Sequence, residues 1–467
     1  PARVLALGFA AGFLALTKVS AVLFAPVAVI ILAGRLGRRA DLPWRAGSRA
    51  GRLAGWRRGA ALLAAGTVAL VVAAGCLWTA YGWRYSAAPI PDQAFAEPWS
   101  EVLMTSPSPL PDKLADVGGG DFAPGPVQAA ITWAREHRVL PEAWRYGFAF
   151  TTYHARARLA YFAGEFRTDG WWEFFPTAFL LKTTWPVLLA LVAAVVLAFR
   201  QPPAARRRWG YRVAPLVAFV LVYATAAITS HLNIGHRHLL PIYPPLFILL
   251  GVLTVPRRGN LSRFGLGLVA ALWAWQAVEA MRTRPHYLAY FNPLAGGPAH
   301  AHRLFVDSSL DWGQGLPDLA AWLRENRGDQ PVYLSYFGSD EPLRFDLAAT
   351  RIGDAYFDHG RRRTLPPLSP GLYCLSATML QRVYTQVRGP WTPALEQTYW
   401  ARAHAIAAAA PDTPPTTADL EAFEQLRFGR FCNYLAPRAP DAVVGRTFLV
   451  YRLSESELDA ALNQPLP

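Results

Sequence analysis

Six long apolar stretches dominate residues 1–282. A helix needs about 20 apolar residues to cross the hydrocarbon core of a bilayer, and each stretch meets or approaches that length. The stretches run over Val4–Ala33, Gly59–Ala80, Thr177–Phe199, Tyr211–Thr229, Leu239–Val255 and Phe264–Met281. We therefore predict a polytopic α-helical membrane protein, with about six spans in this chain.

The first stretch is 30 residues long and is interrupted by Gly8, Gly12, Lys18 and Pro26. Two structures fit this pattern: one broken, tilted span, or two short membrane segments. A lysine in the middle of such a stretch must face a protein interior or a watery cavity. The alternative is a lysine that reaches the surface from a helix end.

Three of the segments between these stretches are rich in arginine. Residues 35–58 hold eight Arg and one Asp, residues 200–208 hold four Arg, and residues 256–263 hold three. The positive-inside rule places such segments on the cytoplasmic side. Alternation of the spans then places residues 81–176, residues 230–238 and everything after Met281 outside.

The long outer loop, residues 81–176, divides into three parts. Ala87–Pro126 is rich in Pro, Gly, Asp and Ser, which predicts irregular chain. Pro141–Tyr161 is predicted to be helical. Gly170-Trp-Trp-Glu-Phe-Phe-Pro176 is typical of an aromatic belt at a membrane interface, leading into the next span.

Residues 283–467 are predicted to form a soluble, extracytoplasmic α/β domain, because helical and strand patterns alternate there. The predicted helices cover Leu316–Glu325, Thr378–Val383 and Leu420–Leu426, and the predicted strands cover Pro331–Phe337, Gly371–Leu375 and Arg446–Arg452. The proline-rich pieces Pro366–Pro370 and Pro411–Pro415 are predicted loops.

Composition agrees with a membrane protein, since 53% of the 467 residues are hydrophobic and only 17% are charged. The net charge of +14 comes mostly from Arg and is attributed to the loops, because no motif for nucleic-acid binding is present. The cysteines lack metal or redox spacing, although Cys374 and Cys432 could pair outside the cell. The chain begins with Pro1, so we expect a further segment upstream.

The sequence His231-Leu-Asn-Ile-Gly-His-Arg-His238 stands directly before an apolar stretch. An arginine fork fits phosphate oxygens, and histidines add hydrogen bonds, so His236, Arg237 and His238 are predicted to bind a lipid-linked phosphate. Two alternatives are anchoring of a helix end among lipid headgroups and metal binding. Lys18 and Lys182 are candidates for further phosphate contacts.

Carboxylates supply a second group of candidates. In Asp307-Ser-Ser-Leu-Asp-Trp-Gly-Gln314, Asp307 and Asp311 could bind sugar hydroxyls or a cation, and the alternative is turn and helix-cap chemistry. Asn233 and Glu173 are also candidate sugar or acceptor contacts. By position alone, Glu173 or another acidic residue of the outer loop could act as a general base; these others are Glu142, Glu165 and Asp169.

Five motifs in order carry a family resemblance. They are Ala11-Gly-Phe-Leu-Ala-Leu-Thr-Lys18, Gly170-Trp-Trp-Glu-Phe-Phe-Pro176, Phe179-Leu-Leu-Lys-Thr183, Asn233-Ile-Gly-His-Arg-His-Leu-Leu-Pro-Ile-Tyr-Pro244 and Asp307-Ser-Ser-Leu-Asp-Trp-Gly-Gln314. Together they resemble the phospholipid-carrier-dependent glycosyltransferases of family 39, which are related to protein O-mannosyltransferases. They also resemble the lipid A-modifying enzymes of family 83. Both families belong to the C-type superfamily.

The resemblance implies an inverting transfer of a sugar from a polyprenyl-phosphate donor to a glycan, lipid or protein acceptor, on the outer face of the bacterial inner membrane. It places the general base after the first transmembrane helix of the family, hence upstream of Pro1. A divalent metal is an open question. Gly315 stands where the family has an acidic residue. Two alternatives are a transporter or flippase for a lipid-linked or anionic substrate, and a membrane-anchored receptor that displays the C-terminal domain.

Overall fold

The structure is a computed structural model of the chain. It describes residues 1–38, 40–46, 48–88, 95, 98–103, 125–155, 158–254, 263–353, 365–410 and 414–464. Most of the predicted irregular segment Ala87–Pro126 lies outside these residues, as does most of the arginine-rich segment 256–263.

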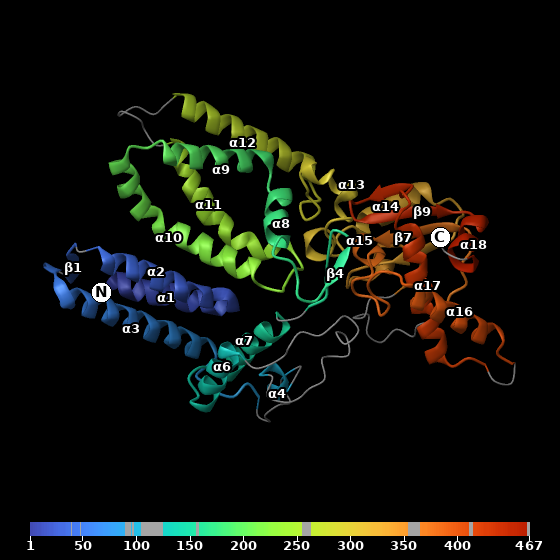
Figure 1. Ribbon diagram of the computed structural model, residues 1–467, viewed down its shortest axis with the longest axis horizontal. Helices are drawn as coiled ribbons and strands as arrows, with labels where there is room; N and C mark the ends of the chain where they lie inside the picture. Colours follow the sequence, from blue (N-terminus) through green and yellow to red (C-terminus); the bar gives the residue numbers. More distant parts are fainter. Residues whose placement is uncertain are drawn as a thin grey trace.

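The chain is mostly helical, with helices in one part and a sheet in the C-terminal part (Figure 1). Within the described residues, four helical segments are long and apolar enough to cross a membrane. They are Val19–Gly37, α3 (Gly55–Ala80), α10 (Pro203–Ile228) and His236–Thr254. A fifth candidate is the pair α8 (Phe174–Lys182) and α9 (Trp185–Phe199), which is bent by 109°. The last predicted span is also helical, as α12 (Arg263–Thr283).

The first apolar stretch forms two helical segments rather than one continuous helix. Helix α1 (Ala2–Thr17) ends at Lys18, whose backbone is extended, and the 3-10 turn η1 (Val19–Leu23) then leads into α2 (Phe24–Gly37). The chain turns there, and α2 runs back toward the hairpin end of the helical part (Figure 1). Lys18 is therefore an exposed turn residue rather than a charge buried in a span.

Helix α1 packs closely along α3 because two glycines of α1 face α3. A Cβ atom on Gly8 would lie 2.6 Å from the Cβ atom of Val72, and one on Gly12 would lie 2.6 Å from that of Cys76. These distances are far below van der Waals contact. The small-residue pattern of α1 is thus explained by helix packing, as is common between apolar helices.

Two of the arginine-rich connections lie at one end of the helical part (Figure 1). The hairpin of β1 (Leu42–Ala46) and β2 (Arg49–Leu53) lies there, as does the turn between α9 and α10. The opposite end carries the C-terminal part and three helices of the long loop, α4 (Trp99–Val102), α6 (Pro126–Glu136) and α7 (Glu142–His154). Helix α7 confirms the first part of the helix predicted over Pro141–Tyr161, whereas Ala160 and Tyr161 belong to a strand.

The prediction that the aromatic residues of Gly170–Pro176 lie at a membrane interface is wrong for three of the four. Trp171, Phe174 and Phe175 are 7%, 2% and 1% exposed, and only Trp172 is largely exposed. The hairpin of β3 (Ala160–Phe162) and β4 (Glu165–Arg167) supplies Phe162, which packs against Trp171 and Phe174. The aromatic cluster is therefore a protein core and not a lipid-facing girdle.

The segment after α12 completes this core. It includes the short helices η4 (Pro293–Ala295) and α13 (Pro298–Ala301) and the turn η5 (Asp307–Ser309). Buried side chains of this segment, Ala289, Phe291, Ala301 and Phe305, share one cluster with Phe174, Phe175, Leu181 and Leu239. Residues 283–310 thus pack onto the helices, and the sheet region begins after them.

The C-terminal sheet has five strands in the order β6-β5-β7-β9-β8. The central strand β7 (Gly371–Ser376) pairs in parallel with β5 (Val332–Ser335) and antiparallel with β9 (Phe448–Leu453). The edge strands are β6 (Thr350–Arg351), parallel to β5, and β8 (Ala442–Val444), antiparallel to β9. The three predicted strands are confirmed, and both edge strands were missed because they are short.

Helices cover both faces of the sheet. The predicted helices are confirmed as α14 (Leu316–Asn326), a short α15 (Ala377–Leu380) and a longer α17 (Thr417–Leu435). The sequence prediction missed α16 (Pro393–Ala407) and α18 (Glu455–Asn463). Alternation along β7 places Cys374 in the core on the α14 face, whereas Cys432 of α17 lies in the core of the opposite face. Both thiols are free, so the disulfide that the sequence left possible does not form.

Candidate functional site

The motifs that stood out in the sequence meet where the helical part joins the C-terminal part. The turn η5 docks onto the segment Ile234–His236, which leads into the 3-10 helix η2 (His236–Ile242) and then into α11 (Tyr243–Leu250) and η3 (Gly251–Thr254). The Ser308 hydroxyl donates to the Ile234 carbonyl at 3.1 Å, and the His236 amide donates to the Ser309 hydroxyl at 3.1 Å. We call this contact the junction.

Gly235 makes the junction possible through close approach. A Cβ atom there would lie 3.1 Å from the Cβ atom of Ser308 and 3.2 Å from its carbonyl carbon. The backbone of Gly235 is extended, with φ −179°, a conformation that any residue can adopt. The need for glycine at this position is therefore steric.

Replacing Gly235 by alanine should loosen the junction. Overpacking of this kind typically costs about 1–3 kcal/mol, so the thermal unfolding temperature of the purified chain should fall. Gly147→Ala is the matched control, because a Cβ atom at Gly147 meets nothing within 4 Å. Equal stability of Gly235→Ala and wild type would show that Ser308 can move away without cost.

Lys182 lies inside the junction. Its ammonium group donates to the carbonyl of Leu288 at 2.8 Å and to the carbonyl of Ser309, and it lies 4.2 Å from the centroid of the Phe291 ring. These contacts join the end of α8 to the segment after α12 and to η5. The structure thus gives Lys182 carbonyl partners, where the sequence predicted a phosphate.

His236 is also held within the protein. Its Nε2 atom shares a hydrogen bond of 2.8 Å with the Tyr243 hydroxyl, which in turn lies 2.6 Å from the Thr183 hydroxyl. Its backbone amide is bound to Ser309. His236 therefore fixes the start of η2, and its neighbour Arg237 is left exposed.

Asn233 is buried, at 1% exposure, beside the start of α8. Its Oδ1 atom accepts a hydrogen bond of 2.6 Å from the Trp171 amide. Gly170 allows this contact, because it has φ +72° and because a Cβ atom there would lie 3.0 Å from the Asn233 side-chain carbon Cγ. The buried Nδ2 atom of Asn233 has no hydrogen-bond partner among the described residues. It remains a candidate donor to a ligand.

Three cations from separate parts of the chain converge near His238. Lys18 comes from the turn after α1, Arg158 from the segment between α7 and β3, and Arg237 from η2, and all three interact electrostatically with His238. The His238 Nε2 atom is buried without a hydrogen-bond partner within the described part of the chain. We call Lys18, Arg158 and Arg237 the outer cation cluster. The guanidinium of Arg237 also lies 5.0 Å from the centroid of the Trp312 ring.

Asp307 faces this cluster from the C-terminal side. It is 3% exposed, has φ +54°, and interacts electrostatically with Arg158 and Arg237. Its carboxylate accepts hydrogen bonds from the Tyr384 hydroxyl and from the Ser308 amide. Burial raises the pKa of Asp307, and the hydrogen bonds and the two arginines oppose that rise.

Asp311 is wholly buried and ties η5 to the start of α15. Its carboxylate accepts hydrogen bonds of 3.2 Å from the backbone amides of Gly313 and Thr378. Burial raises the pKa of Asp311 to about 6, and the hydrogen bonds oppose that rise. These contacts match the turn-chemistry alternative for Asp311, because its oxygens point at backbone amides of the protein.

Replacing Asp311 by asparagine should change how stability depends on pH. Because the pKa of Asp311 is raised from 3.8 to about 6, its contribution to stability is full below pH 3.8 and is lost as pH rises through about 6. The free energy of unfolding of wild type relative to Asp311→Asn should therefore fall by roughly 2–3 kcal/mol from pH 4 to pH 7. Pulse proteolysis in detergent at several pH values measures this difference in the free energy of unfolding. A difference that does not vary with pH would contradict the raised pKa.

The outer-loop carboxylates have no described contact with the cluster. Glu173 is half-buried at the start of α8, and its side chain makes no capping hydrogen bond. Glu142 accepts from the Ala87 amide at 3.1 Å. Glu165 pairs with Arg167 at 2.9 Å and accepts from the indole of Trp171. Asp169 is exposed.

The C-terminal part supplies contacts that the sequence analysis missed. Tyr384 binds the Asp307 carboxylate, and the Thr378 hydroxyl accepts a hydrogen bond of 3.0 Å from the Asp307 amide. Gly315, at the start of α14, packs against Phe448, and a Cβ atom there would lie 3.3 Å from that ring. There is no room at this position for the acidic side chain that the family resemblance would place there.

Among the residues that the structure describes, no group of three or more His, Cys, Asp or Glu side chains could hold a metal ion. Comparison with known proteins gives no match to a protein-family model, a curated protein or a solved structure. The function must therefore be argued from the geometry of the outer cation cluster.

Proposed function

We propose that the chain belongs to an integral-membrane glycosyltransferase that moves a sugar from a polyprenyl-phosphate donor to an acceptor on the outer face of the bacterial cytoplasmic membrane. One observation carries the proposal. Lys18, Arg158 and Arg237 converge on one place at the end of the apolar helices that lies opposite the arginine-rich connections. By the positive-inside rule, that end is extracytoplasmic.

The chemistry of such a transfer fits the cluster. As the glycosidic bond breaks, negative charge grows on the phosphate oxygen of the leaving polyprenyl phosphate. Cations fixed beside that oxygen stabilise the transition state more than the ground state, because the charge they meet is larger there. Arg237 offers an exposed planar donor fork for two phosphate oxygens. Arg158, which also interacts with Asp307 and Tyr384, adds a second guanidinium, and Lys18 adds an ammonium group.

The position of the cluster suits a lipid-linked donor. The helices α2, α3 and α10 expose apolar side chains along their length, including Val29, Val71 and Leu221. A polyprenyl tail would lie against such side chains, while its phosphate would stay at the helix ends. The exposed Trp312 beside Arg237 offers an aromatic surface on which a sugar ring could pack. No described residue is assigned as the catalytic base.

Sugar transfer can be tested with the protein expressed from its complete gene and placed in proteoliposomes. Radiolabelled polyprenyl-phosphate sugars from a membrane lipid extract serve as donors, and the same membranes supply acceptors. We expect label to move from the lipid to an acceptor, with release of polyprenyl phosphate. Movement of the labelled lipid between leaflets without any transfer would instead identify a flippase.

A further inference from the structure

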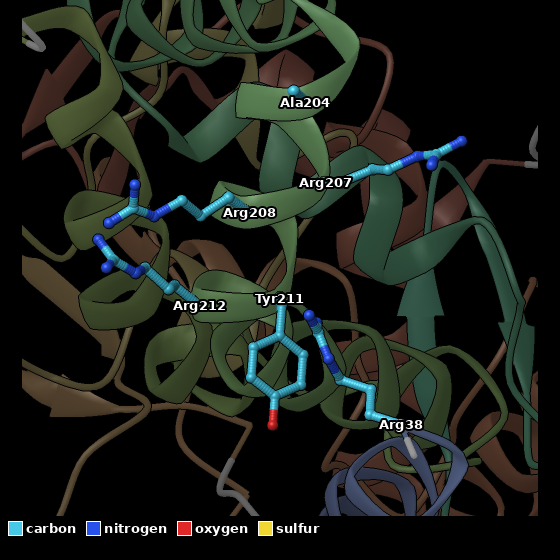
Figure 2. Close-up of a pocket in the computed structure, with 6 residues that line it drawn as sticks. All are labelled: Arg38, Ala204, Arg207, Arg208, Tyr211 and Arg212. Carbon is cyan, nitrogen blue, oxygen red and sulfur yellow. The ribbon is translucent and has the colours of Figure 1, made fainter. Parts of the chain in front are cut away.

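A second group of arginines lies at the other end of the helices. Here Arg38, Arg207, Arg208 and Arg212 surround a hollow of about 650 Å³ together with Ala204 and Tyr211 (Figure 2). All but Arg38, which follows α2, belong to the first turns of α10. The hollow is far from the outer cation cluster, at the end where the arginine-rich connections gather (Figure 1).

The side chains differ in direction. Arg208 and Arg212 extend from one face of α10 toward the same side, whereas Arg207 points the other way (Figure 2). Arg38 lies over the ring of Tyr211, with its guanidinium carbon 3.9 Å from the ring centroid. Arg208 and Arg212 are four residues apart, and like charges at this spacing destabilise a helix. An anion between them would turn that repulsion into attraction.

These arginines differ from their neighbours in having no anionic or carbonyl partner among the described residues. Arg35 donates to the carbonyls of Ala40 and Asp41, and Arg58 donates to those of Leu36 and Arg38. In contrast, Arg207, Arg208 and Arg212 have no hydrogen bond or ion pair with any described side chain or carbonyl. Asp41 lines a neighbouring hollow and not this one.

We propose that this hollow binds the phosphate of an anionic phospholipid. Two arginine forks match the two free oxygens of a phosphate diester, and basic pockets between helices on the cytoplasmic side bind lipid headgroups in this way. The lipid source is favoured over a soluble phosphate because both helices that border the hollow also expose apolar side chains beyond it. Leu36 and Ile31 of α2 and Val217 and Leu221 of α10 are all exposed.

A lipid bound in the hollow would stabilise the packing of α2 against α10, and these two helices are already in contact. Helix α2 follows directly on Lys18 and η1, so the bound lipid would also restrict the movement of Lys18, one member of the outer cation cluster. The inference relies on the helices spanning a membrane, as the proposed function does. Its test uses phospholipid binding alone, so it can fail or succeed independently of sugar transfer.

The test measures retention of phosphatidylglycerol by the purified chain in phosphatidylcholine nanodiscs, with native mass spectrometry as the readout. The wild type should retain phosphatidylglycerol in preference to phosphatidylcholine. The double variant Arg208→Gln/Arg212→Gln should retain roughly tenfold less phosphatidylglycerol than the wild type. The matched control is Arg45→Gln/Arg49→Gln, which removes the same charge from exposed positions in the hairpin at the same end.

Three outcomes would overturn the proposal. An equal loss in both double variants would show general attraction to an anionic surface. Displacement of the lipid by soluble glycerol phosphate at comparable concentration would show that the hollow takes a free phosphate. Equal retention of phosphatidylglycerol by the wild type and by Arg208→Gln/Arg212→Gln would show that the hollow holds no lipid phosphate.

Discussion

Replacing both Arg158 and Arg237 by alanine should weaken the binding of polyprenyl phosphate by at least about 100-fold. Each charge-assisted hydrogen bond contributes about 1.5–3 kcal/mol, and about 1.4 kcal/mol corresponds to tenfold in affinity. The two side chains come from separate elements, so both can meet one phosphate group without sharing a backbone segment. Titration of a short-chain polyprenyl phosphate into the detergent-solubilised chain measures the change.

Control variants decide whether the cluster or overall charge is responsible. Arg84→Ala removes one exposed arginine near the outer end of α3, and it should leave affinity within about threefold of the wild type. Arg237→Lys keeps the charge but loses the planar fork, so we expect an intermediate affinity. Because Arg158 also interacts with Asp307 and Tyr384, the unfolding temperature of each variant must be measured too. A double variant that folds and binds like the wild type would sink the phosphate assignment.

The elements most accessible to sequence reasoning were those whose burial is set locally. Helix α14 and strand β7 were predicted because their own apolar pattern reveals a buried face or a fully buried run. The sequence left open whether the first apolar stretch divides at Lys18, since one extended residue separates two apolar helices that read as one stretch. The short edge strands β6 and β8 carry too few residues to show a period.

The expectations of an aromatic belt at the membrane interface and of a possible disulfide failed for the same reason. Trp171, Phe174 and Phe175 are buried by the hairpin β3–β4 and by a segment more than a hundred residues later. Cys374 and Cys432 are separated by the sheet itself. In both cases the local sequence gives the chemistry of the side chain, and a distant segment decides its surroundings.

The residues of the candidate site also divide into those that a local motif revealed and those that only the fold brings together. Arg237 was identified because it stands in a polar motif beside an apolar stretch. Arg158 was missed, since its segment shows no motif and only the fold brings it to His238 and Asp307. A sequence signal was available only in part: Arg158 lies in the segment 81–176, where arginine is less frequent than in the segments 35–58, 200–208 and 256–263.

The C-terminal part holds the site together from the outside. Tyr384 and Thr378 bind Asp307, and Thr378 also donates its amide to Asp311. These contacts fix η5, and η5 in turn supports Ile234–His236 through Ser308 and Ser309. The conformation of Arg237 thus depends on residues of the sheet region that would touch no substrate. Loss of the C-terminal part is therefore expected to affect the outer cation cluster.

Replacing Lys182 by methionine should separate stability from phosphate binding. Methionine has a similar length, but it leaves the carbonyls of Leu288 and Ser309 buried without a donor. Each unsatisfied group costs about 1–3 kcal/mol, so the free energy of unfolding should fall by about 2–6 kcal/mol. Thermal unfolding and limited proteolysis of the detergent-solubilised chain measure this loss. Below the unfolding temperature, affinity for polyprenyl phosphate should change by less than about tenfold, because the ammonium group faces carbonyls.

The opposite pattern is expected for Arg237→Ala, since Arg237 is exposed and its loss leaves no buried partner unsatisfied. That variant should unfold like the wild type and bind polyprenyl phosphate weakly. Leu180→Met is the matched control for Lys182→Met, because Leu180 lies on the same helix with a half-exposed side chain. If Lys182→Met instead unfolds like the wild type and loses phosphate binding, then Lys182 contacts the phosphate directly. In that case the carbonyl contacts of its ammonium group would not persist when the donor is bound.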